Sequence, residues 1–147
     1  MAELDQEKVL VKLDQVDQYL SELDQILPDS FEEYRTPEKR RSTERLLQLS
    51  IEGVIDTCNL LVSGLDLGLP SEENDLFDKL AEHEVITDEL KATLYEMRGF
   101  RNILVHEYAS TDDEIVYEVA HDKMKDFRLF FQEIKTFLKN LNSSTSE

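Results

Sequence analysis

Four long segments of this chain carry apolar residues at alternating steps of three and four, and no segment alternates cleanly at a step of two. Steps of three and four place side chains on one face of an α-helix, whereas a half-buried strand needs alternation. The chain holds only four Gly and three Pro, so few breaks interrupt these stripes. The pattern predicts an all-α protein: an antiparallel four-helix bundle with one or two short additional helices.

Caps and breakers predict the helix boundaries. The first stripe stops at Pro28, and the second helix opens with Thr36 as its N-cap and Pro37 at its first position. The third long helix is expected to start at Thr87 and the fourth near Asp122, because their stripes begin there. Between the long helices we expect a loop and two short helices, over residues 67–74, 75–83 and 115–120.

The length of 147 residues fits a single domain. We expect this helical domain over residues 1–141, followed by a disordered polar tail over residues 142–147. Cys58, the only cysteine, lies in an apolar stripe and is expected to be buried. Gly53 interrupts the second helix, where it is expected to mark a close crossing by a neighbouring helix.

The formal net charge of −17 argues against general, charge-driven binding of nucleic acid. A local basic groove remains compatible with it, and the candidate is a cluster of five basic residues within eleven positions: Arg35, Lys39, Arg40, Arg41 and Arg45. An ordinary solvated helix start explains the same cluster. The first residues do not resemble a signal peptide, and no apolar run suggests a membrane span, so we expect a cytoplasmic protein without membrane contact.

The stretch from Arg101 to Tyr108, RNILVHEY, breaks the third stripe by placing a cation where Leu or Met is expected. A mid-stripe arginine must pair with an anion or extend to water. We expect the third helix to continue through Tyr108, so that Arg101 and Tyr108 differ by only about 20° around its axis. Arginine binds phosphate oxygens and histidine moves protons near neutral pH, so Arg101 with His106 suggests chemistry on a phosphodiester.

Each of these residues also has an ordinary structural explanation. Arg101 can pair with a carboxylate of the bundle, such as Glu52 or Asp56 on the second helix. His106 can be a packed or surface histidine, and Tyr108 can cap the core with its hydroxyl in water. A site buried against its own subunit's acids would count against chemistry on a phosphodiester.

Other kinds of site receive little support. Glu118 and His121 form one Glu-x-x-His pair, but a di-iron bundle needs two such pairs and further inward glutamates. The sequence lacks a Gly-rich phosphate loop, a G-x-S-x-G elbow and an H-E-x-x-H zinc pattern. We therefore predict no metal site and no cofactor.

The spacing Arg101-x4-His106-x-Tyr108 matches the R-x4-6-H-x-Y signature of the HepT-like branch of the HEPN superfamily. The stretch from Glu44 to Pro70 also resembles the long second helix of that branch and the loop after it. An acidic-apolar helix and a last amphipathic helix follow the HEY sequence, as in that branch. The resemblance covers roughly residues 5–141.

This resemblance implies a helical-bundle ribonuclease that acts as a toxin. Two subunits would form a homodimer with a composite, metal-independent site for RNA, to which each contributes Arg101, Asn102 and His106. The usual partner is a small MntA-like nucleotidyltransferase antitoxin, which would silence the toxin by transferring AMP to Tyr108. Further candidates for RNA binding are Arg98 and the basic residues Lys39, Arg40, Arg41 and Arg45.

Two other functions are compatible with the sequence. One is a non-catalytic helical module that binds a nucleotide or a nucleotidyltransferase partner. The other is a purely structural bundle or adaptor, which leaves Arg101 in the apolar stripe unexplained.

Overall fold

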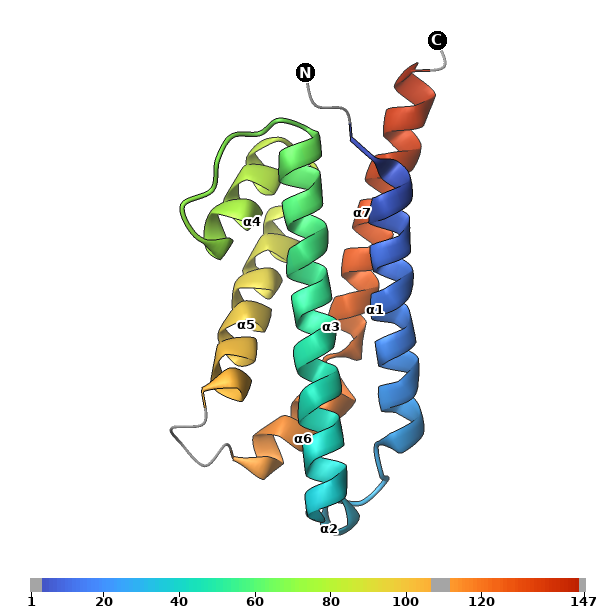
Figure 1. The fold of residues 1–147 in the computed structure, drawn as a ribbon, viewed down its shortest axis with the longest axis vertical. Coiled ribbons are helices and arrows are strands. Elements are labelled where there is room, and N and C mark those ends of the chain that lie inside the picture. The colour runs from blue at the N-terminus through green and yellow to red at the C-terminus, as the bar shows by residue number, and fades with distance from the viewer. Residues whose placement is uncertain (1–3, 107–111, 146–147) are drawn as a thin grey trace.

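The computed structural model describes residues 4–106 and 112–145. Over these residues the chain forms seven helices and no strand: α1 (Gln6–Ile26), α2 (Phe31–Tyr34), α3 (Pro37–Gly64), α4 (Glu73–Glu82), α5 (Asp88–Val105), α6 (Asp113–Asp122) and α7 (Met124–Thr145). The long helices α1, α3, α5 and α7 alternate in direction along one axis, as Figure 1 shows. The predicted antiparallel four-helix bundle is confirmed.

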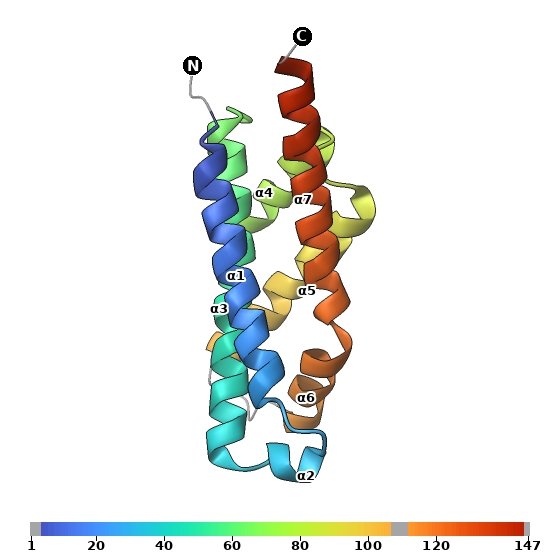
Figure 2. The same cartoon turned by 90° about the vertical axis from the view of Figure 1, so that its right-hand side faces the viewer.

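Three short helices accompany the bundle in the described part of the chain, rather than one or two. α2 and α6 lie at one end of the molecule, and α4 lies beside α5 towards the other end (Figures 1 and 2). α2 is not among the helices predicted from the sequence. Its N-cap is Ser30, whose hydroxyl accepts a hydrogen bond from the backbone N–H of Glu33 at 3.2 Å. This cap stabilises a single turn that has no apolar stripe of its own.

α5 ends at Val105, so the expectation that this helix continues through Tyr108 is wrong. His106 follows with an extended backbone, at φ −88° and ψ 104°. The angle expected between Arg101 and Tyr108 on a straight helix therefore does not apply. Tyr108 itself lies outside the described residues.

α7 continues through Asn142 and ends at Thr145, beyond the domain boundary expected at residue 141. The side chain of Asn142 accepts a hydrogen bond from the amide of Gln6 at 2.9 Å, which joins the start of α1 to the last turns of α7. Residues 142–145 are thus helical, in contrast to the disordered tail expected there.

The apolar stripes meet in two clusters. The larger cluster fills the space between α1, α3, α4, α5 and α7, and its fully buried members include Val9, Leu61, Phe77, Leu94 and Phe130. Cys58 belongs to it, and burial raises the pKa of its thiol, so this cysteine is an apolar core residue. The smaller cluster packs α2 and α6 against α1 and α3, through Leu23, Tyr34, Leu47, Val116 and Ala120.

α3 meets the length and composition of a membrane-spanning helix, although the sequence suggested no such span. An 18-residue window of it has a mean hydropathy of 1.2, and 56% of that window is buried inside the protein. The core helix of a soluble protein meets the same criteria, so this finding is weak evidence for a membrane. In this fold the apolar surface of α3 is used to pack against α1, α4 and α5.

Gly53 lies where α1 and α3 cross closely, as its place in the second stripe predicts. A Cβ atom added at this position would lie 2.4 Å from Cγ2 of Val16. Val16 is fully buried and branched at Cβ, so its methyl group has no free rotamer to move into. The close contact between the two helices therefore requires glycine.

We expect Gly53→Ala and Gly99→Ala to have opposite effects on stability. Alanine at position 53 overpacks the α1–α3 contact and should lower the free energy of unfolding by about 1–3 kcal/mol. Gly99 is also helical, but a Cβ there meets nothing within 4 Å, so alanine should raise this free energy by about 0.5–1 kcal/mol. Denaturant unfolding at one fixed protein concentration measures both. Equal stability of the two variants would show that the crossing tolerates a larger residue.

Candidate functional site

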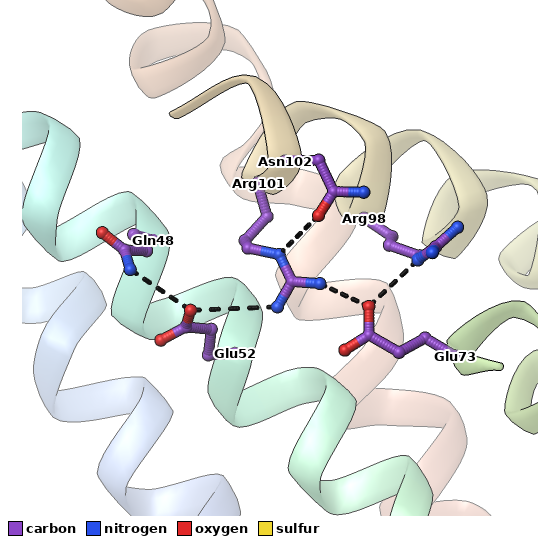
Figure 3. Close-up of polar contacts among 6 residues, drawn as sticks. All are labelled: Gln48, Glu52, Glu73, Arg98, Arg101 and Asn102. Carbon is purple, nitrogen blue, oxygen red and sulfur yellow. Dashed lines mark hydrogen bonds and ion pairs between the residues drawn. The ribbon is translucent and has the colours of Figure 1, made fainter. Parts of the chain in front are cut away.

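Arg101 lies near the end of α5, and three groups of its own subunit contact its guanidinium group (Figure 3). Nε donates a hydrogen bond to Oδ1 of Asn102 at 2.9 Å. Nη2 donates to Oε1 of Glu73, and Nη1 lies 3.8 Å from Oε2 of Glu52. The Arg101 side chain is only 13% exposed. The cation that interrupts the apolar stripe is thus neutralised where three helices meet.

The neighbours of Arg101 form one continuous polar network. Arg98 lies one helical turn before Arg101, and its Nε donates to the same oxygen of Glu73 at 3.0 Å. Glu52, on α3, also accepts a hydrogen bond from the amide of Gln48 at 3.2 Å. Two arginines therefore face two glutamates, and the formal charge of this group of four is zero.

The packing of α4 fixes the position of Glu73, which is the first residue of that helix. Leu76, Phe77 and Leu80 bury one face of α4 in the main core. The ring of Tyr95 on α5 packs against Phe77, and its hydroxyl donates a hydrogen bond to Asp78. This hydrogen bond stabilises the protonated hydroxyl and raises the pKa of Tyr95 to about 12. Apolar packing and a polar contact together hold Glu73 against the two arginines.

The other residues of the motif lie at the end of α5 and beyond it. Asn102 accepts the hydrogen bond from Arg101, so its Oδ1 orients the guanidinium group. His106 is exposed, and its backbone N–H caps the helix by donating to the carbonyl of Asn102 at 3.0 Å. Exposed apolar side chains flank this segment, with Ile103 55% and Val105 44% exposed.

The pairing of Arg101 agrees with its ordinary structural explanation. Glu52 is one of the two partners suggested from the sequence, whereas Asp56 pairs instead with Lys12 at 3.6 Å. The contacts of Arg101 to acidic residues of its own subunit count against a phosphodiester site in the isolated subunit. Any function assigned to Arg101 must therefore use N–H groups that these acids leave available.

Glu73 was not anticipated from the sequence. Its local pattern shows only an acidic residue at a helix start, which is common because negative charge there stabilises the helix. Nothing in that pattern indicates that α4 folds back against α5. The one available signal was that Arg98 and Arg101, one helical turn apart, both require carboxylate partners.

The basic cluster lies apart from Arg98 and Arg101. Arg35 follows α2, and the other four members occupy the first turns of α3, at the α2 end of the molecule and beyond the last turn of α5 (Figure 1). Arg40 pairs with Asp113 of α6 at 3.6 Å, Arg41 and Arg45 are exposed, and Lys39 is partly exposed. Because Arg98 and Arg101 pair with acids, these two arginines alone do not form a positive groove.

The described residues contain no group of three or more His, Cys, Asp and Glu side chains that could hold a metal ion. Glu118 is exposed on α6. The His121 ring lies 3.3 Å from the carbonyl oxygen of Pro28 and packs edge-on against Tyr117. His121 of the Glu-x-x-His pair therefore has structural neighbours in this fold.

Comparison with known proteins identifies the class of this helical bundle. A family model described as Ribonuclease HepT-like matches residues 16–134, which is most of the chain. The chain therefore belongs to the HepT-like ribonuclease family, as the motif and the second stripe suggested.

Two relatives carry nuclease names. The mRNA nuclease HepT of Shewanella oneidensis is 37% identical over 89 residues, which cover 60% of this chain and 67% of the relative. The tRNA nuclease HepT of Aphanizomenon flos-aquae is 29% identical over 131 residues, or 88% of this chain and 89% of the relative. Among solved structures, a tri-AMPylated HEPN toxin of Shewanella oneidensis in complex with an MNT antitoxin has a TM-score of 0.81 and 29% identity, covering 87% of this chain and 96% of that one.

We expect Tyr95→Phe to weaken the docking of α4 in a pH-dependent way. The pKa of Tyr95 is higher in the folded protein than its ordinary value of 10.0, so the stabilisation is complete below about pH 10 and is lost as pH rises towards 12. Phenylalanine should lower the free energy of unfolding by about 1 kcal/mol near neutral pH. The difference between wild type and variant in urea unfolding should shrink between pH 10 and pH 12. A constant difference would contradict the assignment.

Proposed function

We propose that this protein is the ribonuclease toxin of a toxin–antitoxin pair and cleaves RNA without a metal ion. The observation that carries the proposal is the set Arg101, Asn102 and His106 at one end of α5, in a chain of the HepT-like ribonuclease family. The names of the two relatives support nuclease activity. The solved complex of a related toxin with its antitoxin supports the pairing.

The contacts of Arg101 leave it able to bind a phosphate. A guanidinium group carries five N–H donors. The hydrogen bonds to Asn102 and Glu73 use one donor each, and Glu52 lies 3.8 Å from Nη1, so at least one N–H remains on each terminal nitrogen. Two such donors can bind the non-bridging oxygens of a phosphodiester and stabilise the negative charge of a phosphorane.

The reaction needs a base and an acid, and we assign both to His106 from two subunits. One imidazole takes the proton from the ribose 2′-hydroxyl, whose oxygen attacks phosphorus. The second imidazole, protonated, gives its proton to the leaving 5′-oxygen. The products are a 2′,3′-cyclic phosphate and a 5′-hydroxyl. The exposed Ile103 and Val105 beside Arg101 support a homodimer, because a second copy would cover them.

RNA would reach this site along the basic start of α3. Arg41 and Arg45 are exposed there, and Lys39 is partly exposed. Arg40 and Arg98 would contribute after exchanging Asp113 and Glu73 for phosphate. The high net negative charge makes these local cations more important for binding.

The cytoplasmic location, without membrane contact, stays a prediction.

Substitution of Arg101 or His106 by alanine should abolish RNA cleavage. Loss of the imidazole should cost about 10²–10⁴-fold in rate, and loss of the guanidinium group about 10²–10³-fold. The assay uses labelled RNA with EDTA present and measures the cyclic phosphate product. His83→Ala is the matched control, because His83 is an exposed histidine at the end of α4. Equal cleavage by wild type and His106→Ala would refute the catalytic assignment. Nucleotide binding without cleavage would favour the non-catalytic module.

We further propose that the antitoxin silences this protein by transferring AMP to Tyr108. The tyrosine oxygen attacks the α-phosphorus of ATP, pyrophosphate leaves, and a base takes the hydroxyl proton. Tyr108 follows His106 by two residues, so the added AMP would bring bulk and negative charge close to the RNA phosphate. The AMP groups on the related toxin support this assignment.

Incubation with a cognate nucleotidyltransferase and ATP should add one or more AMP units to the wild-type chain. Intact-mass spectrometry measures the shift, and the modified protein should lose RNA cleavage. Tyr108→Phe should show no shift, whereas Tyr19→Phe, which changes a tyrosine on α1, should behave as wild type. A shift that persists in Tyr108→Phe would place the modification elsewhere.

A further inference from the structure

The contacts around Arg101 come from three different parts of the fold. Glu52 belongs to α3, Glu73 to α4, and Asn102 to α5 itself. An arginine side chain has several rotatable bonds, and contacts in three directions restrict the plane of its guanidinium group. The two glutamates balance the charges of Arg98 and Arg101, and the neutral Asn102 adds a contact that neutralisation does not require.

Of the two carboxylates that contact Arg101, Glu73 makes the stronger contact. Its Oε1 accepts a hydrogen bond from Nη2 of Arg101, whereas Glu52 lies 3.8 Å from Nη1, beyond hydrogen-bond distance. The same Glu73 oxygen also accepts a hydrogen bond from Arg98 at 3.0 Å. As Figure 3 shows, Glu73 lies between the two arginine side chains and joins them.

We infer that Glu73 is a positioning residue, which orients the guanidinium group of Arg101 so that its remaining N–H groups meet the scissile phosphate. This inference rests on the proposed function. It assigns a role to α4, because the apolar packing of Leu76, Phe77 and Leu80 determines where Glu73 lies. The orientation of Arg101 then depends on a helix that contributes no residue to the sequence motif.

The opposite role for the same contact is inhibition. A carboxylate that only competed with phosphate for Arg101 would weaken RNA binding, and its removal would increase cleavage. Positioning gives the reverse effect on turnover. Without Glu73 the guanidinium group retains its charge but samples more orientations, so the rate of the chemical step falls while RNA binding is kept or strengthened.

The test compares Glu73→Ala, Glu73→Gln and Glu72→Ala in RNA cleavage. We expect Glu73→Ala to lower kcat by about 10- to 100-fold without raising KM. Glu73→Gln should lie between this variant and wild type, because its amide oxygen still accepts a hydrogen bond from arginine. Glu72→Ala removes the same charge from the neighbouring exposed residue and should match wild type. Unchanged or faster turnover in Glu73→Ala would overturn the inference.

A second readout does not need catalysis. In ¹⁵N NMR spectra recorded at low temperature, the Nη2–H signal of Arg101, which donates to Glu73 and is assigned by its loss in Arg101→Lys, should be protected from exchange with water. Protection should persist in Glu72→Ala and be lost in Glu73→Ala, while circular dichroism confirms that both variants are folded. If wild type and His106→Ala both fail to cleave RNA, the proposed function fails, and the NMR signal still decides whether Glu73 orders Arg101. Protection that survives Glu73→Ala would also overturn the inference.

Discussion

The hydrogen bond between Arg101 and Glu73 links the apolar core to the candidate site. A cation in the middle of a helical stripe cannot remain unpaired in a bundle, because desolvation of an isolated charge is too costly. The fold meets this requirement by placing α4 against α5, where Glu73 also reaches Arg98. α4 is therefore part of the site as well as the core, and its apolar face controls the position of a charged group. Glu52 adds a second carboxylate from α3, so α3, α4 and α5 each contribute a contact to one guanidinium group.

The long helices were predictable because each carries a stripe that spans several turns. α2 and the end of α5 were not, for different reasons. α2 is a single turn, too short for periodicity, although Ser30 followed three residues later by Glu33 is the capping-box pattern and was a usable signal. The third stripe continues from Leu104 to Tyr108 without an intervening Gly or Pro, so nothing in the sequence marks Val105 as the last helical residue. The apolar periodicity of the sequence thus predicts where the long helices lie, but it predicts their ends only where a capping residue or a helix breaker is present.

The candidate site was predictable in its residue types and less so in its contacts. The interruption of a stripe identified Arg101, and facing helices suggested Glu52 as a partner, which the structure confirms. Glu73 is different, because it lies 28 positions before Arg101 and is brought there by the fold of the loop and α4. Periodicity describes one helix at a time and carries no information about such a tertiary contact. The roles of His106 and Tyr108 depend on the motif and on a second subunit, so they stay predictions.

The charge balance of the network bears on how an acidic protein could act on RNA. With a net charge of −17, the chain cannot rely on long-range attraction to collect a polyanion. Arg98 and Arg101 are moreover balanced by Glu52 and Glu73, so the network adds no net attraction of its own. The network instead fixes the orientation of the Arg101 guanidinium group. Contacts on three sides hold this partly buried group, so that its remaining N–H donors have a fixed geometry. In a low-dielectric site, fixed donors stabilise a transition state without reorganisation. A site of this kind would bind RNA weakly from solution and still act on a phosphodiester placed correctly against it. On this view Glu52 and Glu73, which neutralise Arg101 and so weaken RNA binding, are also the groups that fix its orientation for catalysis.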